Sequence, residues 1–372
     1  MPPEGDESVN KDDLYQSRID KVLEGMKKMK LDGLIVSDPK SIRYLTGIYN
    51  EPYERLFVLY LSADKNHVFF LNKLFNVDQK KIREVWTCDT DDVMKIMASN
   101  IAKNGLIGVD KVWPARFLIP LCELTPDAKF LLGSDCVDDA RACKDAEEQR
   151  IMKEASRIND VCIERGAAFV REGVTEKEVA EYIEAQFKAE GASGTSFSTI
   201  VSFGKNAADP HHEPDDTVVK EGDCVLIDMG CVKDGYCSDM TRTFFYKTAP
   251  DKFTKIHDLV REANEKAEAI IRPGVLLCDI DAAARDHIAK AGYANYFTHR
   301  LGHFIGQTDH EQGDVSSSNK NPVKPGMIFS IEPGVYLPGE FGVRIEDLVL
   351  VTDTGCEVLN KVDKKWKILC KR

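Results

Sequence analysis

The chain has 372 residues and a formal net charge of −12, from 50 lysines and arginines against 62 aspartates and glutamates. Hydrophobic residues make up 43% of it and charged residues 30%, which is typical of a soluble globular protein with a sizeable core. Because a phosphate or anionic lipid surface would repel this charge, nucleic acid and membrane are not expected partners. The length predicts about two domains.

The cysteines and the N-terminus point to a cytoplasmic protein. The 11 cysteines are scattered without a CxxC pair, so we interpret them as reduced structural thiols. The first residues, MPPEGDESVNKDD, are acidic and polar and have no apolar signal-peptide core. No apolar run is long enough to span a bilayer.

Residues 1–140 carry mixed helix and strand signals and no cluster of reactive side chains, which predicts a small α/β domain. The predicted elements, in chain order, are a helix over 14–33 ended by Gly33, a strand over 34–38, a helix over 41–47, a hairpin of 56–61 with 67–71, and a strand over 106–110. The composition becomes polar around 133–145, and we place the domain boundary there.

Residues 141–372 are predicted to form a second domain of helices and strands. Thr175 and Glu178 occupy capping-box positions, so a helix should follow them. The predicted helices begin at Asp145 and span 176–190, 252–271 and 278–291, and the predicted strands lie within 197–204, 224–230, 231–246, 327–336 and 343–351.

Four carboxylates stand in or beside these apolar strands. Asp228 ends VLIDMG, Asp239 follows eleven residues later, Glu332 comes between IFSI and a proline, and Glu346 is expected in mid-strand with Arg344 on the same face. Either aspartate alone is explained by a turn or a cap. Together, four such carboxylates would repel one another unless cations gathered them. The pattern therefore favours an oxygen-rich site for divalent manganese, cobalt, iron or zinc.

Three histidines, His299, His303 and His310, lie within the stretch FTHRLGHFIGQTDHE at 297–311. His299 and His303 have the spacing of a helical zinc pair, but the glycines in this stretch disfavour a helix, and no HExxH signature is present. In a strand the two histidines would share one face. Spacing alone leaves open which of them binds a metal.

The motifs IDMG, DGYCSDMTRTF, HRLGHFIG, SIEPGVY and VRIED, in this order, resemble those of the pita-bread dinuclear metallopeptidases, which include prolidase, aminopeptidase P and methionine aminopeptidase. The resemblance covers about 196–355, and all five ligand positions are filled. It implies an α+β protein in which a pita-bread catalytic domain over 141–372 follows a creatinase/prolidase-like α/β domain over 1–140. It also implies two divalent metal ions per subunit (Mn, Co or Zn) and a homodimer.

The resemblance assigns a role to each candidate residue. The implied metal ligands are Asp228 on one ion, Asp239 and Glu346 bridging both, and His303 and Glu332 completing the second. The implied catalytic residues are His211, His310 and Glu332, and the implied substrate-binding residues are His211, His299 and Arg344. His212 is interpreted as a neighbour of His211 without a catalytic role.

The implied reaction is hydrolysis of Xaa-Pro peptide bonds by a hydroxide bridging the two metals, with short proline-containing peptides as substrates. An Xaa-Pro dipeptidase is the first hypothesis, and an Xaa-Pro aminopeptidase acting on longer peptides is the alternative. Methionine aminopeptidases lack the N-terminal domain, and creatinase lacks the full ligand set. A metal-free peptide-binding module is a third hypothesis, which the intact ligand set disfavours.

Overall fold

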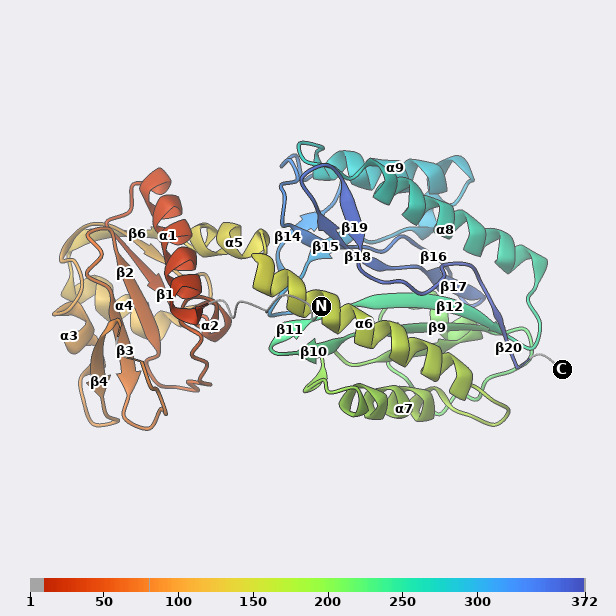
Figure 1. Ribbon diagram of the computed structural model, residues 1–372, viewed down its shortest axis with the longest axis horizontal. Helices are drawn as coiled ribbons and strands as arrows, with labels where there is room; N and C mark the ends of the chain where they lie inside the picture. Colours follow the sequence, from red (N-terminus) through yellow and green to blue (C-terminus); the bar gives the residue numbers. More distant parts are fainter. Residues whose placement is uncertain (1–9, 80, 371–372) are drawn as a thin grey trace, which may run out of the picture. The chain divides into compact units, whose positions relative to one another are not determined.

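The structure is a computed structural model that describes residues 10–79 and 81–370. It consists of two compact units, one up to Arg141 and one from Ala142 onward. Figure 1 shows their elements in chain order. Among the described residues, no helix combines the length and the apolar character needed to cross a membrane.

The first unit is built on a six-stranded sheet in the order β4-β3-β2-β1-β5-β6. Its strands are β1 (Gly33–Val36), β2 (Val58–Ser62), β3 (Val68–Asn72), β4 (Arg83–Thr87), β5 (Asn104–Val109) and β6 (Asp127–Leu132). β2 is antiparallel to β1 and β3, whereas the other neighbours are parallel. Its helices are α1 (Lys11–Met29), α2 (Pro39–Thr46), α3 (Val93–Ala98), α4 (Ala115–Leu124) and α5 (Asp135–Ala142). Helices α1, α2 and α5 bury apolar side chains against one face of the sheet, and α3 and α4 against the other.

The prediction that Gly33 ends the first helix is wrong. The helix ends at Met29, and Lys30 caps it in the left-handed conformation with φ 58°. Gly33 instead opens β1, where a Cβ would lie 2.1 Å from Tyr60 Oη on the neighbouring strand. The glycine is therefore required by the close approach of a tyrosine, which a local pattern does not reveal.

The described residues of the second unit form four sheets. Their orders are β11-β10-β7, β20-β12-β9-β8, β14-β13-β15-β18-β19 and β16-β17. The strands are β7 (Gly194–Thr195), β8 (Ile200–Phe203), β9 (Cys224–Met229), β10 (Cys231–Lys233), β11 (Tyr236–Cys237), β12 (Met240–Tyr246), β13 (Gly302–Phe304), β14 (Glu311–Val315), β15 (Ile328–Ile331), β16 (Gly334–Leu337), β17 (Phe341–Arg344), β18 (Asp347–Val351), β19 (Cys356–Val358) and β20 (Ile368–Leu369).

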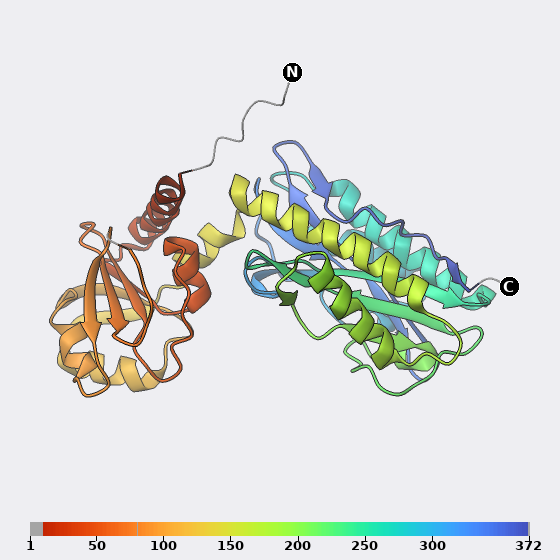
Figure 2. The ribbon, with the colours of Figure 1, turned by 60° about the horizontal axis from the view of Figure 1, so that its bottom comes forward.

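The helices of the second unit confirm the predicted ones to within about a residue. They are α6 (Ala146–Phe169), α7 (Glu176–Ala189), α8 (Asp251–Ile270) and α9 (Leu277–Lys290), with the short 3₁₀ helices η1 (Gly204–Ala208) and η2 (Ala294–Tyr296). Asp145 and Thr175 each form a complete capping box at the start of α6 and α7. In Figure 1, α7 lies below the strands of this unit and α8 and α9 above them, and Figure 2 shows α6 beside α7.

The apolar run at 343–351 is not one strand, so the expectation that Glu346 lies in mid-strand is wrong. β17 ends at Arg344 and pairs with β16, whereas β18 begins at Asp347 and pairs with β15. Glu346 lies in the break, where its backbone N–H donates to Thr241 O. The chain changes its sheet partner at this point, and the run of apolar residues continues across the change.

Candidate active site

All nine predicted site residues line a single cavity of about 570 Å³ in the second unit. The metal-ligand candidates among them are Asp228, Asp239, His303, Glu332 and Glu346, and the others are His211, His299, His310 and Arg344. A volume of this size matches a pocket for a small ligand.

Two antiparallel strand pairs bring the four carboxylates together. Asp228 lies in β9, opposite Thr241 of β12, and Asp239 stands just before β12. In the second strand pair, Ile331 of β15 is opposite Asp347 of β18. Because the strands are antiparallel, Glu332 after β15 and Glu346 before β18 follow this pair at the same end of the ladder. The expectation that Asp239 belongs to the strand of Thr241 is wrong by one residue, because β12 begins at Met240.

His303, the only histidine of its stretch in a strand, faces these carboxylates. Its Nε2 lies 3.5 Å from Asp239 Oδ2 and 3.6 Å from Glu332 Oε1. Its Nδ1 lies 3.2 Å from the carbonyl oxygen of Phe304, so Nδ1 donates to it, and in the neutral ring the lone pair is on Nε2. A backbone carbonyl in this position is the usual outer partner of a metal-binding histidine. Ligand atoms of Asp239, His303 and Glu346 all lie within 4.8 Å of one another.

The carboxylates fit a metal centre and are poorly explained without one. Asp228 Oδ1 and Asp239 Oδ1 are buried and have no hydrogen-bond partner among the described residues. Burial and then the charge of neighbouring carboxylates raise the pKa of Asp239 and of Glu346, and burial raises the pKa of Glu332 to about 7. Buried carboxylate oxygens with one imidazole form a donor set suited to hard or borderline divalent cations.

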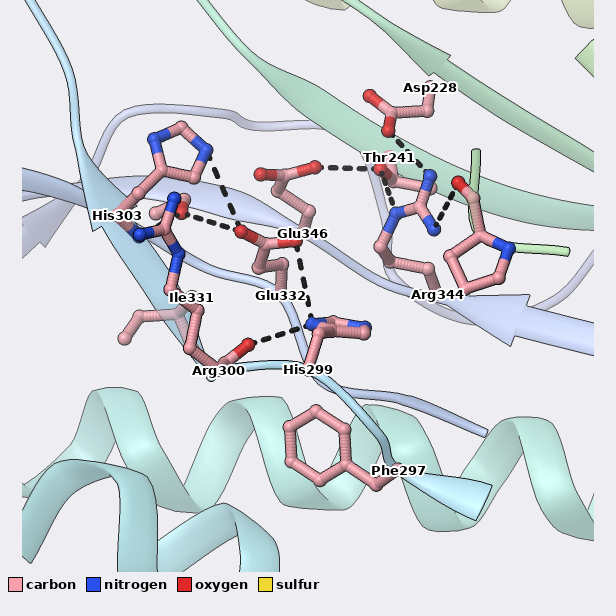
Figure 3. Close-up of polar contacts among 12 residues, drawn as sticks. Asp228, Thr241, Phe297, His299, Arg300, His303, Ile331, Glu332, Arg344 and Glu346 are labelled. Carbon is pink, nitrogen blue, oxygen red and sulfur yellow. Dashed lines mark hydrogen bonds and ion pairs between the residues drawn. The ribbon is translucent and has the colours of Figure 1, made fainter. Parts of the chain in front are cut away.

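Arg344 links this cluster to the rest of the cavity. Its Nη2 donates to Asp228 Oδ2 at 2.5 Å, its Nε to Thr241 Oγ1 at 3.1 Å and its Nη1 to Tyr336 Oη at 2.8 Å. Thr241 Oγ1 in turn donates to Glu346 Oε2 at 2.7 Å. Figure 3 shows this chain from Asp228 through Arg344 and Thr241 to Glu346. No role was predicted for Thr241 or Tyr336 from the sequence, although SIEPGVY places that tyrosine four residues after Glu332.

His299 is already hydrogen-bonded at both ring nitrogens. Its Nδ1 lies 2.7 Å from Arg300 O and therefore donates to this carbonyl, and its Nε2 lies 3.0 Å from Tyr336 Oη. Because Arg344 donates to the same hydroxyl, Tyr336 donates onward to His299 Nε2. Burial and then the charge of Arg344 lower the pKa of His299 to about 4, so the ring is neutral near pH 7. Only the carbon atoms of the ring remain for contact with a ligand.

His310 is held differently. Arg300 Nη2 donates to His310 Nδ1 at 2.9 Å, so Nε2 carries the proton of the neutral ring. Partial burial and the nearby His303 lower the pKa of His310 to about 4. The ring can therefore donate one hydrogen bond into the cavity. Arg300 also lines the cavity, although no role was predicted for it from the sequence.

His211 reaches the cavity from the loop that follows η1. Its backbone N–H donates to Asp209 Oδ1 at 3.0 Å, and the carbonyl of the preceding Pro210 accepts from Arg344 Nη1 at 3.3 Å. The loop is thereby connected to the same arginine that contacts Asp228.

Sequence profiles of two known families match the two units. The profile of the Creatinase/Prolidase N-terminal domain matches residues 18–143, and that of Metallopeptidase family M24 matches residues 150–353. An uncharacterized peptidase of Staphylococcus saprophyticus is 37% identical over 356 residues, covering 93% of this chain and all of that protein.

Solved structures of similar proteins cover nearly the whole chain. The dipeptidase PepE of Mycobacterium ulcerans has 32% identity and a TM-score of 0.90, covering 96% of this chain and 98% of that one. A prolidase of Thermococcus sibiricus has 33% identity and a TM-score of 0.87, covering 95% and 99%. The expected pita-bread fold with a creatinase-like N-terminal domain is confirmed. The chain belongs to metallopeptidase family M24.

Proposed function

We propose that the chain is an Xaa-Pro dipeptidase that uses two divalent metal ions. The observation that carries the proposal is the group of four carboxylates around His303, three of them buried, in which Asp228 Oδ1 and Asp239 Oδ1 lack any partner among the described residues. The likeness to a dipeptidase and to a prolidase over almost the full chain supports the same substrate class.

Five residues would hold the metals. They are Asp228, Asp239, His303, Glu332 and Glu346. Two divalent cations, of manganese, cobalt or zinc, supply the Lewis acidity that lowers the pKa of the attacking water. Arg344 and Thr241 keep the carboxylates of Asp228 and Glu346 oriented through the hydrogen bonds described above.

The other side chains would act on the substrate. His310 can donate from Nε2 to the oxygen that becomes negative when the scissile carbonyl is attacked. Glu332 can take the proton of the attacking water and pass it to the prolyl nitrogen, which must gain a proton to leave. His211 lines the same cavity and can hold the substrate carbonyl, while the ring carbons of His299 offer an apolar contact.

Arg300 favours a dipeptide over a longer peptide. The proline of an Xaa-Pro dipeptide carries a free carboxylate, which needs a cationic partner in a cavity. Arg344 is engaged by Asp228, Thr241 and Tyr336, whereas the guanidinium of Arg300 makes one hydrogen bond among the described residues, to His310. Arg300 therefore has N–H donors left for a substrate carboxylate.

The test compares Ala-Pro with Ala-Pro-Ala as substrates of protein loaded with manganese or cobalt. We expect hydrolysis of Ala-Pro. Cleavage of Ala-Pro-Ala but not of Ala-Pro would indicate an Xaa-Pro aminopeptidase instead of a dipeptidase. If the protein bound no metal after reconstitution and cleaved neither peptide, the metal-free peptide-binding module would be the better reading.

A further inference from the structure

A fully buried carboxylate, Glu176, lies outside the metal cluster at the first position of α7. Its exposed fraction is 0%. Burial raises its pKa, and the hydrogen bond from His212 is the largest influence in the opposite direction. The positive end of the helix dipole also favours a negative charge at this position. Such a carboxylate is costly to bury unless its lone pairs are used.

Both oxygens of Glu176 accept hydrogen bonds from one segment of chain. Oε1 accepts from Phe203 N at 2.6 Å and from Asn206 Nδ2 at 3.0 Å. Oε2 accepts from Asp215 N at 3.1 Å and from His212 Nε2 at 2.7 Å. The carboxylate therefore connects Phe203 with Asp215. Residues 204–217, which begin directly after Phe203 and include Asp215 near their end, are here called the histidine loop.

His211 lies in the histidine loop between two anchors. On one side, Arg344 holds the carbonyl of Pro210. On the other, His212 is bound to Glu176. Among the described residues, the side chain of His211 makes no hydrogen bond of its own, and only its backbone N–H is held, by Asp209 Oδ1. Because His211 and His212 are adjacent, a displacement of His212 would also move the imidazole of His211 away from the cavity.

We propose that Glu176 is a positioning residue that acts through His212 to hold the histidine loop where it carries His211 into the cavity. The part of the inference that concerns turnover rests on the proposed function. His212 is then more than a neighbour of His211: it is the link between a buried anchor and a residue that faces the substrate.

The same atoms could be read as a metal site, because ligand atoms of Glu176, His212 and Asp215 lie within 4.8 Å of one another. The hydrogen bonds argue against that reading. Both oxygens of Glu176 already accept two N–H groups each, and Nε2 of His212 must carry a proton to donate to a carboxylate. A metal would have to displace these bonds.

The experiment is a double-mutant cycle in the metal-loaded enzyme, comparing wild type, His212→Ala, His211→Ala and the double variant on Ala-Pro. His212→Ala should lower kcat/KM about tenfold or more, since small misplacements of a substrate-facing group have effects of this size. In the His211→Ala background, His212→Ala should change kcat/KM less than about twofold, because the imidazole that His212 positions has already been removed. His212→Gln, which keeps a donor, should restore part of the rate.

Two further measurements keep the test independent of the substrate assignment. Hydrogen exchange at Phe203 and Asp215 should accelerate in His212→Ala, while the two catalytic metal equivalents remain bound. His287→Ala is the matched control, because His287 Nε2 pairs with Glu262 Oε2 at 3.1 Å between α8 and α9, and it should change neither measurement.

Three results would each overturn the inference. They are equal losses of activity on substituting His212 in the wild-type and His211→Ala backgrounds, unchanged hydrogen exchange in His212→Ala, and the loss of a third metal equivalent in His212→Ala. If the wild type cleaved no Xaa-Pro dipeptide, the proposed function would fail. The exchange experiment would still decide whether His212 positions the loop.

Discussion

The imidazole rings of His303 and His310 stack with their centroids 3.9 Å apart, yet their nitrogens have different partners. His303 points Nε2 at Asp239 and Glu332, whereas His310 accepts a hydrogen bond from Arg300 at Nδ1. The two rings in contact therefore fit the two predicted tasks, one as a metal ligand and one as a hydrogen-bond donor.

Substitution should separate these tasks. His303→Ala should weaken metal binding by more than the roughly 10–100-fold that loss of an outer partner costs. His310→Ala should leave metal content unchanged and lower kcat roughly 10²–10³-fold, the effect of removing one donor to a developing oxyanion. Metal analysis and steady-state kinetics on Ala-Pro check both. Normal turnover in His310→Ala would refute its role.

A second prediction concerns the hydroxyl that orients Glu346. Thr241→Val removes the hydrogen bond to Glu346 Oε2 and should reduce metal affinity about 10–100-fold, measured by competition with a chelator. Thr243→Val is the control on the same strand, because Thr243 Oγ1 donates to the backbone carbonyl of Arg344 and to no ligand. Equal losses of affinity in both variants would contradict a specific role for Thr241.

The sequence predicted which side chains lie at the site better than it predicted the hydrogen bonds between them. Asp228, Glu332 and His303 stand in short motifs whose residue types reveal their chemistry, and the structure brings them to one cavity. The bond from Thr241 to Glu346 joins residues 105 positions apart, and no periodicity encodes such a pairing.

In the fold as well, features set by residues close in sequence were predicted correctly, and features set by contacts distant in sequence were not. The capping box at Thr175 predicted the start of α7 correctly, because its hydrogen bonds lie within four residues. The end of α1 was predicted at Gly33, and that glycine instead accommodates Tyr60 from another strand. Glu346 was misplaced in a strand because apolar residues continue across the change of sheet.

A third prediction concerns the acid stability of the folded protein. His257 is buried, its Nε2 donates to Thr243 O at 3.0 Å, and burial lowers its pKa from 6.5 to about 4. Between pH 6.5 and 4 the unfolded chain binds a proton that the folded chain does not, so stability falls as the pH falls. This single group accounts for up to about 3 kcal/mol of that loss.

His257→Gln keeps a donor near Thr243 and removes the titration. Urea unfolding of the variant should therefore depend less on pH than that of the wild type across this window. An identical pH dependence in the two proteins would mean that His257 is not the group responsible.

The fourth prediction concerns the buried ion pair of Lys144 and Glu311, whose Nζ and Oε2 lie 3.2 Å apart. Lys144→Met leaves a buried carboxylate without this cation and should cost about 3–5 kcal/mol of unfolding free energy. The double variant with Glu311→Met should recover part of the loss. Lys153→Met is the matched control, because the exposed pair of Lys153 and Glu357 should be worth under about 1 kcal/mol.

The last prediction tests Arg300 as the partner of the substrate carboxylate. Arg300→Ala should raise KM for Ala-Pro about tenfold or more, as expected for loss of a hydrogen bond between two charged groups. Ala-Pro amide lacks the negative charge, so its KM should change much less. Because Arg300 also donates to His310 Nδ1, kcat is expected to fall for both substrates. The difference in KM between the acid and the amide isolates the carboxylate contact, and equal changes for the two substrates would remove the main structural argument for a dipeptidase.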